Sequence, residues 1–260
     1  MATARINGID LHYELHGSGP ALVLVHGALG NRLGWWQQVP ALSRRFTCVL
    51  VDQRGFGASA EAAGGPGMQA FPDDLLALLD ALGLERAALL GQSLGGWTCL
   101  AAALRRPERV SALILADTHA RIADPDAAEL RRRRQERGEI PDSLRLRALA
   151  PDFPERHPEL THLYFQIEAL NPPRPPDYFS GYFGPGIIEP RQLATLAIPT
   201  LFVVGEQDVG TPPAVVRLLA RHLPDARVAE ISQAGHSAYF ERADAFNRAV
   251  LAFLADVSQA

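Results

Sequence analysis

Six apolar runs recur along the chain, and helix-like stretches separate most of them. Five runs are almost continuously apolar, which is typical of strands buried on both faces of a parallel sheet. They cover residues 21–25, 47–51, 87–90, 111–116 and 200–204. The sixth run, residues 227–231, is weaker and is predicted nearer a sheet edge. The pattern therefore predicts a largely parallel central sheet.

The N-terminal segment carries a hairpin signal. Asn7-Gly8 lies between two strand-like stretches, residues 2–6 and 9–15. An Asn-Gly pair favours a two-residue turn, because both residues tolerate positive φ. We therefore expect an antiparallel hairpin to open the sheet, which gives eight strands in total.

Helix start and stop signals occur between the runs. Pro72, Asp73 and Asp74 precede the stretch 75–82, and Gly83 follows it. Proline and acidic residues favour the first turn of a helix, and glycine favours its end. Similar helices are predicted over residues 97–104, 213–222 and 243–255. Alternating strands and helices predict a doubly wound α/β fold with right-handed crossovers.

The alternation stops between residues 118 and 193. This segment has no convincing strand, and it carries helix-like pieces before a proline-rich joint at residues 171–176. The pieces cover residues 125–137, 143–150 and 155–170. We interpret residues 118–193 as a helical cap, called the cap below, inserted into a core formed by residues 1–117 and 194–260.

Composition narrows the class of protein. Of the 260 residues, 47% are apolar and 21% charged, which suits one α/β domain with an insertion and excludes a disordered chain. The formal net charge of -4 argues against a general nucleic-acid binder. No apolar run approaches the ~18 residues of a membrane helix, and no signal-peptide pattern opens the chain. We expect a cytoplasmic protein, monomeric or homodimeric, that binds neither nucleic acid nor membrane.

The cysteines and histidines give no metal signal. Cys48 and Cys99 lie in separate apolar runs and are expected to be buried free thiols. The histidines show no ligand spacing on one helix, and no phosphate-cradling loop is present. Neither a metal nor a cofactor is expected.

A run of four arginines, residues 131–134, suggests at first a site for an acidic partner. Asp124, Asp126 and Glu129 lie at the start of the same predicted helix, and the arginines lie toward its end. That order complements the helix dipole. We therefore interpret the run as the solvated face of a cap helix.

The strongest chemical motif is Gly91-Gln92-Ser93-Leu94-Gly95-Gly96, between a predicted strand and a predicted helix. This G-x-S-x-G pattern in a strand-turn-helix is typical of a turn that presents a serine hydroxyl to substrate. Glycines two residues either side of Ser93 avoid collisions with the neighbouring strand and helix. We expect Ser93 to adopt a strained, positive-φ conformation.

A serine nucleophile needs a base, and the base needs an orienting carboxylate. His236 is the candidate base, because it follows the sixth run at the sheet edge where α/β active sites gather. Asp208 follows the run 200–204 and is the candidate carboxylate, which gives the chain order Ser, Asp, His. Asp117 ends the run 111–116 and is the rival to Asp208.

The oxyanion formed on attack needs two N–H donors. The backbone N–H of Leu94 is one candidate, at the positive end of the helix after the nucleophile. The loop after residue 25 offers the second, from Ala28 or alternatively from Leu29. His26 opens this loop and is expected to brace it by hydrogen bonds rather than to take part in proton transfer.

Along nearly its whole length the chain resembles α/β-hydrolase-fold serine hydrolases. The resemblance rests on the motif around Ser93 and on His26-Gly27, residues 52–59, residues 205–208 and Gly235-His236. It implies that Asp52 and Arg54 hold loops near the site.

Residues 115–122 and the length of the cap are similar to those of 3-oxoadipate enol-lactonases. Meta-cleavage C–C hydrolases usually have a glycine-rich oxyanion loop and a tryptophan after the catalytic histidine, where this chain has Ala28-Leu29 and Ser237. Ser93 disfavours the families with an aspartate nucleophile, the epoxide hydrolases and haloalkane dehalogenases.

Aromatic residues from the cap and from near the two catalytic loops are candidates for the pocket wall. The predicted pocket residues are Leu29, Trp35, Trp97, Tyr164, Phe165 and Phe179. Further aromatic candidates are Trp36, Tyr178, Tyr182 and Phe183. If they line the pocket, the acyl group is apolar or aromatic; the alternative is that most are packing residues. Arg121 and Arg174 are guesses for a substrate carboxylate.

The sequence thus predicts hydrolysis of a small carboxylic ester or lactone through an acyl-enzyme formed on Ser93. Two alternatives stay open. The same serine could support C–C bond hydrolysis, perhydrolysis or acyl transfer, or the chain could be a ligand-binding member of the fold without turnover.

Overall fold

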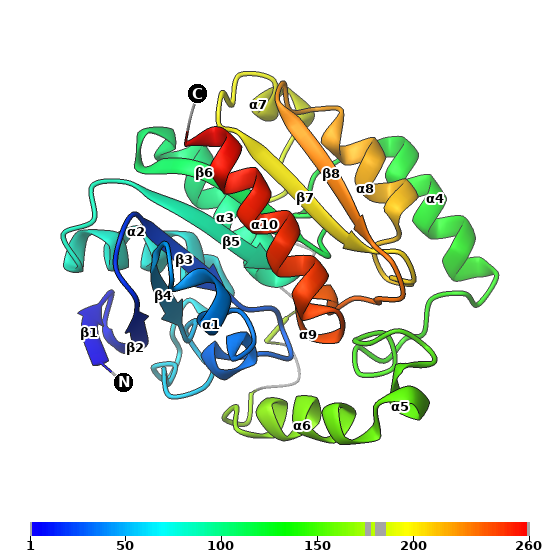
Figure 1. Ribbon diagram of the computed structural model, residues 1–260, viewed down its shortest axis with the longest axis horizontal. Helices are drawn as coiled ribbons and strands as arrows, with labels where there is room; N and C mark the ends of the chain where they lie inside the picture. The colour runs from blue at the N-terminus through cyan, green and yellow to red at the C-terminus, as the bar shows by residue number, and fades with distance from the viewer. Residues whose placement is uncertain (1, 175–177, 180–185, 259–260) are drawn as a thin grey trace.

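The structure is a computed structural model that describes residues 2–174, 178–179 and 186–258 (Figure 1). Its centre is one eight-stranded sheet with the order β1-β2-β4-β3-β5-β6-β7-β8. Antiparallel pairing is confined to β1 with β2 and β2 with β4, and the other neighbours are parallel. The strands are β1 (Ala2–Ile6), β2 (Ile9–His16), β3 (Ala21–Val25), β4 (Thr47–Val51), β5 (Ala87–Gln92), β6 (Val110–Ala116), β7 (Thr200–Gly205) and β8 (Ala226–Ile231). The predicted mostly parallel sheet with an N-terminal hairpin is confirmed.

Burial along the strands follows the hydrophobic pattern. Every residue of β3, β5 and β7 is buried, as expected for strands covered on both faces. Only Ile231 of β8 is buried, and β8 lies at the sheet edge, as its weaker pattern predicted.

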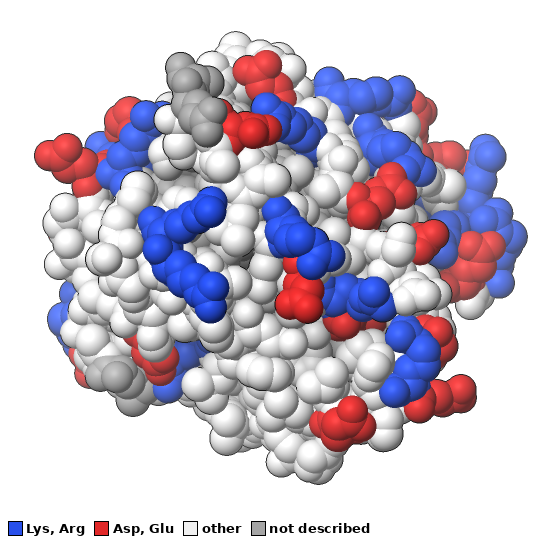
Figure 2. Space-filling view, in the orientation of Figure 1, with Lys and Arg blue, Asp and Glu red and all other residues white. Residues whose placement is uncertain are grey.

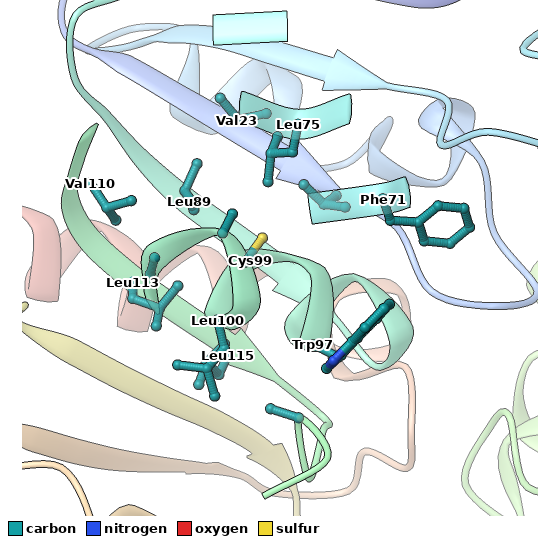
Figure 3. Packing of buried hydrophobic residues seen from close by; sticks show 14 of the residues in the cluster. Val23, Phe71, Leu75, Leu89, Trp97, Cys99, Leu100, Val110, Leu113 and Leu115 are labelled. Atoms are coloured by element: carbon teal, nitrogen blue, oxygen red, sulfur yellow. The ribbon is translucent and has the colours of Figure 1, made fainter. Parts of the chain in front are cut away.

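Helices cover both faces of the sheet. Alternate strand residues divide between two cores: Val23 and Leu89 face one, Leu22 and Leu90 face the other. The first core is closed by α2 (Phe71–Ala81), α3 (Leu94–Arg105) and α8 (Pro213–Ala220), and Figure 3 shows its packing beside β5 and α3. The second is closed by α1 (Val39–Leu42) and α10 (Ala243–Val257), which crosses the sheet in Figure 1. The short elements are η1 (Arg32–Trp35), η2 (Gly67–Ala70), η3 (Pro107–Arg109) and α9 (Ala238–Glu241).

Among the residues that the structure describes, four helices lie between β6 and β7, at the position predicted for the cap. They are α4 (Pro125–Glu136), α5 (Phe153–Arg156), α6 (Pro158–Ala169) and α7 (Pro190–Leu193). The predicted helix over 155–170 is interrupted at His157, which has φ -140°, because Pro158 disfavours a helical residue before it.

The predicted helix over residues 143–150 is wrong. This segment consists of turns and bends, and its last three residues, Ala148, Leu149 and Ala150, are buried. The N–H of Ala150 donates to the carboxylate of Glu241 at 2.8 Å, so a tertiary bond takes the donor that a helix would have used. Tertiary contact here overrides a favourable local propensity.

Among the described helices, none is long and apolar enough to cross a membrane. Charged side chains of both signs are interspersed on the face shown in Figure 2. On α4, Arg132 and Arg133 form ion pairs with Glu129, and Arg132 also pairs with Glu136. This part of the arginine run is solvated, as predicted.

Candidate active site

Ser93 lies in the turn between β5 and α3. Its φ is 51° and its ψ is -111°, which confirms the predicted strained conformation. A methyl group on Gly91 would lie 2.2 Å from the carbonyl oxygen of Gly95, and one on Gly95 would lie 2.2 Å from that of Val25. The glycines are therefore required because the main chains approach too closely for any side chain.

Hydrogen bonds from the neighbouring strand hold this turn in place. The N–H of Ser93 donates to the carbonyl of Ala116 at 2.8 Å, and the hydroxyl of Thr118 donates to the carbonyl of Ser93 at 2.6 Å. Ala116 is the last residue of β6, and Thr118 follows it by two residues. Strain at Ser93 is thus maintained by one main-chain bond to β6 and one bond from the side chain of Thr118, which follows β6.

The structure brings Ser93, His236 and Asp208 together. The Oγ of Ser93 lies 2.9 Å from Nε2 of His236, and Nδ1 of His236 lies 2.8 Å from Oδ2 of Asp208. The other oxygen of Asp208 accepts the N–H groups of Gly210 and Thr211, both at 2.8 Å. Because Asp208 accepts from Nδ1, the proton resides there, and Nε2 is free to accept the hydroxyl proton of Ser93.

Charge near His236 stabilises its protonated form. Burial lowers the pKa of His236, but the charge and hydrogen bond of Asp208 and the charge of Asp117 raise it more. The result is a pKa above the ordinary value for histidine. The imidazolium that forms when His236 takes a proton is therefore favoured at this position.

Asp117, the rival carboxylate, accepts hydrogen bonds from main-chain N–H groups and not from His236. One of its oxygens accepts the N–H of Gly205 at 2.9 Å, and the other accepts the N–H of Ala238 at 3.0 Å. Burial and the nearby charge of Asp208 raise the pKa of Asp117 well above its usual range. Asp117 thus ties the end of β7 to the start of α9, and Asp208 makes the bond to His236.

Both predicted oxyanion donors border the same cavity as Ser93. Ala28 and Leu94 contribute to its wall, and Leu94 is the first residue of α3. A methyl group on Gly27 would lie 3.1 Å from Cβ of Ser93, which places the loop of Ala28 directly beside the serine. The positive end of α3 adds to the donor capacity of the Leu94 N–H.

His26 braces this loop, as predicted. Its Nδ1–H donates to the carbonyl of Gly27 at 2.8 Å, and its Nε2 accepts the N–H of Gln53 at 3.0 Å. Burial lowers the pKa of His26 to about 4, so the ring is neutral near pH 7. Both ring nitrogens are engaged in holding main chain.

Asp52 and Arg54 also hold loops, as the resemblance implied. Asp52 accepts the N–H groups of Arg32 and Ala58 at 2.8 and 2.9 Å. The buried guanidinium of Arg54 makes two bonds to Asp74, at 2.8 and 2.9 Å. Neither residue borders the cavity at Ser93.

The cavity above Ser93 has a volume of about 290 Å³. Core loops and the cap both contribute to its wall. Its described lining residues are Ala28, Ser93, Leu94, Asp117, Thr118, His119, Arg131, Leu144, Arg147, Phe179, Gly210, Thr211 and His236. Of the six predicted pocket residues, Phe179 is in this set.

Trp35, Trp97 and Tyr164 are core residues and not pocket residues. Trp35 is fully buried against Tyr239, with ring centroids 4.6 Å apart. Trp97 is buried with the core residues of α3, and its indole N–H donates to Gly186 (Figure 3). The phenol oxygen of Tyr164 accepts the hydroxyl of Ser237 at 3.0 Å. Proximity in sequence to a catalytic loop did not set the direction of these side chains.

The other two pocket predictions also fall outside the described lining set. Leu29 is partly buried and packs against the second core. Phe165 packs there too, with the guanidinium carbon of Arg145 4.5 Å from its ring centroid. Trp36 and Tyr178 do not line the cavity, and Tyr182 and Phe183 lie outside the described residues.

The guessed carboxylate binders, Arg121 and Arg174, are placed elsewhere. Arg121 is buried with its guanidinium over Trp97, and Arg174 stacks on Phe56 at 4.1 Å. The cavity wall instead contains Arg131 and Arg147. Arg131 lies four residues after Ala127, the one described buried residue of α4, and therefore on the same helix face, a relation that only the structure reveals. Arg147 had no sequence signal either, because its segment is irregular.

No group of His, Cys, Asp and Glu among the described residues is arranged to hold a metal ion. Cys48 and Cys99 are buried free thiols, and burial raises the pKa of each, to about 11 for Cys48.

Residues 20–243 match the model of a protein family described as alpha/beta hydrolase fold. The chain belongs to this α/β-hydrolase family. It is a hydrolase, as are an esterase and two enol-lactonases that match it over nearly its full length.

Three relatives illustrate the similarity. The 3-oxoadipate enol-lactonase 2 of Acinetobacter baylyi is 30% identical over 264 residues, which cover 97% of this chain and 96% of that protein. An esterase from Thermogutta terrifontis superposes with a TM-score of 0.81 at 30% identity and covers 98% of each chain. The enol-lactonase of Burkholderia xenovorans gives 0.80 at 29% identity, over 98% of this chain and all of the other. The predicted resemblance to esterases and enol-lactonases is confirmed.

Proposed function

We propose that this hydrolase cleaves a small carboxylic ester or lactone through an acyl-enzyme formed on Ser93. The observation that carries the proposal is the position of His236, which lies within hydrogen-bond distance of both Ser93 and Asp208. In this proposal residues 1–117 and 194–260 supply the nucleophile, base and oxyanion donors, and the cap, residues 118–193, closes the substrate cavity.

Acylation begins when the hydroxyl oxygen of Ser93 attacks the substrate carbonyl and Nε2 of His236 takes the hydroxyl proton. The negative charge that develops on the carbonyl oxygen is met by the backbone N–H groups of Ala28 and Leu94. Asp208 stabilises the imidazolium. The tetrahedral intermediate then collapses, the bond to the leaving alkoxide breaks, and His236 returns its proton to that alkoxide.

Deacylation repeats the same steps with water. His236, neutral again, takes a proton from a water molecule as the water oxygen attacks the acyl carbon. The bond to Ser93 breaks, His236 reprotonates the serine, and the carboxylic acid leaves. For a lactone the leaving alkoxide stays attached to the acyl group, so the product is a hydroxy acid.

The relatives support an acyl–oxygen bond as the one cleaved. One is named an esterase and two are named enol-lactonases, and both kinds of substrate are carboxylic esters. Among the aromatic pocket candidates, Phe179 borders the cavity, which supports an apolar contact to the substrate.

Replacement of the nucleophile tests the proposal. We expect Ser93→Ala to lower kcat for 4-nitrophenyl butyrate by about a million-fold, since the acyl-enzyme cannot form. Thr98→Ser is the control for a conservative hydroxyl change on α3, because Thr98 bonds to Gln53 and does not line the cavity. Wild-type turnover by Ser93→Ala would exclude the mechanism.

Separate replacement of the two buried carboxylates tests the choice of Asp208. We expect Asp208→Asn to lower kcat by about ten-thousand-fold, because the amide reverses the donor pattern that fixes His236. Asp117→Asn is expected to cost less in kcat. A larger loss of kcat at Asp117 would assign the orienting role to that residue.

The alternative reactions are separated by the product. Water, hydrogen peroxide and an alcohol, offered together, compete for the same acyl group. The free acid is the expected main product. A peracid or a new ester would indicate perhydrolysis or acyl transfer, and absence of labelling of Ser93 by a fluorophosphonate would favour a ligand-binding protein.

A further inference from the structure

Two arginines of the cap border the cavity that contains Ser93. Arg131 projects from α4, and Arg147 belongs to the irregular segment between α4 and α5. Both side chains are partly buried. Cationic groups are thus placed in the wall of the site that binds substrate.

Arg147 forms no hydrogen bond or ion pair with any residue that the structure describes, whereas other arginines of the cap do. Arg145 pairs with Glu168 at 3.0 Å, and Arg132 pairs with Glu129 at 2.7 Å. No nitrogen of Arg147 is among the described side-chain atoms that are buried without a partner, so its N–H donors keep access to the cavity. An anion in the cavity would supply the missing acceptor.

The side chain of Arg147 lies close to the reacting groups. A methyl group on Gly210 would lie 3.7 Å from Cδ of Arg147 and 3.8 Å from Nδ1 of His236, so both flank the same point. The positive charge of Arg147 also lowers the pKa of His236. An anion bound by Arg147 would therefore belong to the same molecule whose carbonyl reaches Ser93.

Asp117, the carboxylate in the cavity wall, already accepts hydrogen bonds from the main chain. Both oxygens of Asp117 accept main-chain N–H groups, from Gly205 and Ala238. His119 adds no positive charge, since burial and the charge of Arg131 lower its pKa to about 3. The rest of the wall is largely apolar and includes Leu94, Leu144 and Phe179.

We propose that Arg147, assisted by Arg131, forms a carboxylate-binding subsite, so that the substrate is an ester or lactone with a free carboxylate at its far end. A guanidinium binds a carboxylate through two parallel hydrogen bonds, which gives both affinity and orientation. The apolar wall suits the short carbon chain between the carboxylate and the scissile carbonyl. The proposal rests on the proposed function, because it assigns the substrate class of that site.

Matched ester pairs test the subsite. Monoethyl succinate, glutarate and adipate carry a terminal carboxylate, and ethyl butanoate, pentanoate and hexanoate are their neutral counterparts of equal acyl length. Titration of the released acid at constant pH gives kcat/KM for each. The wild type is expected to prefer at least one anionic ester to its neutral partner by about tenfold or more, and the preferred length reports the separation of Arg147 from Ser93.

Arginine variants connect this preference to the cavity. Arg147→Gln is expected to lower the ratio of anionic to neutral kcat/KM by about tenfold to a hundredfold, mainly through KM. Arg131→Gln should lower the same ratio less. Arg145→Gln and Arg132→Gln, which remove exposed arginines outside the cavity, should leave the ratio unchanged. A wild type without preference, or a ratio that Arg147→Gln does not alter, would overturn the subsite.

Binding without turnover separates this proposal from the proposed function. Calorimetry with the Ser93→Ala variant measures the affinity for adipate and glutarate, and we expect Ser93→Ala/Arg147→Gln to bind them at least about tenfold more weakly. Equal affinity in the two proteins would contradict the subsite whatever the role of Ser93. Full ester turnover by Ser93→Ala would instead contradict the acyl-enzyme mechanism. The binding comparison would still decide whether Arg147 binds a carboxylate.

Discussion

At the scale of single residues, the candidate site depends on positions that admit no side chain. Gly91 and Gly95 lie against main-chain atoms on both sides of Ser93. This feature was predictable from sequence, because the spacing of the two glycines around a serine has one steric explanation in a strand-turn-helix. The positive φ of Ser93 followed from the same spacing.

Addition of one methyl group tests this close packing. We expect Gly95→Ala to lower the free energy of unfolding by about 3 kcal/mol, since the methyl collides with the main chain of β3. Gly83→Ala is the control for conformational cost alone: Gly83 has positive φ, which Gly95 does not, and open space surrounds it, so only about 1 kcal/mol is expected. Urea denaturation measures both. A loss at Gly95 no larger than the loss at Gly83 would contradict the collision.

His26 makes stability depend on pH in a defined direction. Its folded pKa is about 4, below the ordinary value of about 6.5, so the unfolded chain binds the proton more readily. The contribution of His26 to the free energy of unfolding is complete above pH 6.5. It is lost as the pH falls toward 4, by up to about 1.4 kcal/mol per pH unit. Unfolding free energies of the wild type and His26→Gln between pH 7 and 4 measure this, and the variant should show the shallower decline. Parallel curves would contradict the assignment.

At the scale of elements, the core was predictable and the cap was predictable only in part. Six of the eight strands matched their predicted positions because each carries an apolar run, and the other two because Asn7-Gly8 marks the turn of their hairpin. Residues 143–150 have a helical composition, yet the N–H of Ala150 is bound by Glu241, which is 91 residues away in the chain. Local patterns do not record such distant partners.

Glu241 of α9 connects the cap to the loop that carries His236. Its carboxylate accepts the N–H groups of Ala150, Gly235 and Ser237 at 2.8, 3.0 and 3.2 Å. We expect Glu241→Gln to lower the free energy of unfolding by about 2 kcal/mol, because an amide nitrogen would face buried N–H donors. It should also lower kcat, since His236 lies between two of the bonded residues.

The control for Glu241 is Glu230→Gln on β8. Glu230 is exposed and pairs with Arg217, and exposed ion pairs contribute little to stability. Chemical denaturation and steady-state kinetics compare the two variants. A similar effect of both replacements would mean that Glu241 acts only as a surface charge.

At the scale of the whole molecule, residues from distant parts of the chain meet at one edge of the sheet. The contributions of the core, including Ser93 and His236, were predictable, because turns at the carboxyl ends of parallel strands share that edge. Arg131 and Arg147 were not predicted, because their positions depend on how the cap folds back over this edge. The division into cap and core residues at 117/118 and 193/194 stays a prediction.

The acyl-enzyme itself is the most direct test of the proposed function. Wild-type protein is quenched with acid during turnover of 4-nitrophenyl butyrate and digested, and mass spectrometry locates the butyryl group. The chain contains no lysine, so competing acylation of side-chain amines does not arise. We predict a butyryl group on Ser93 in the wild type and none on that peptide in Ser93→Ala. Rapid turnover with the butyryl group on a different residue, or with the same modified peptide in both proteins, would contradict the mechanism.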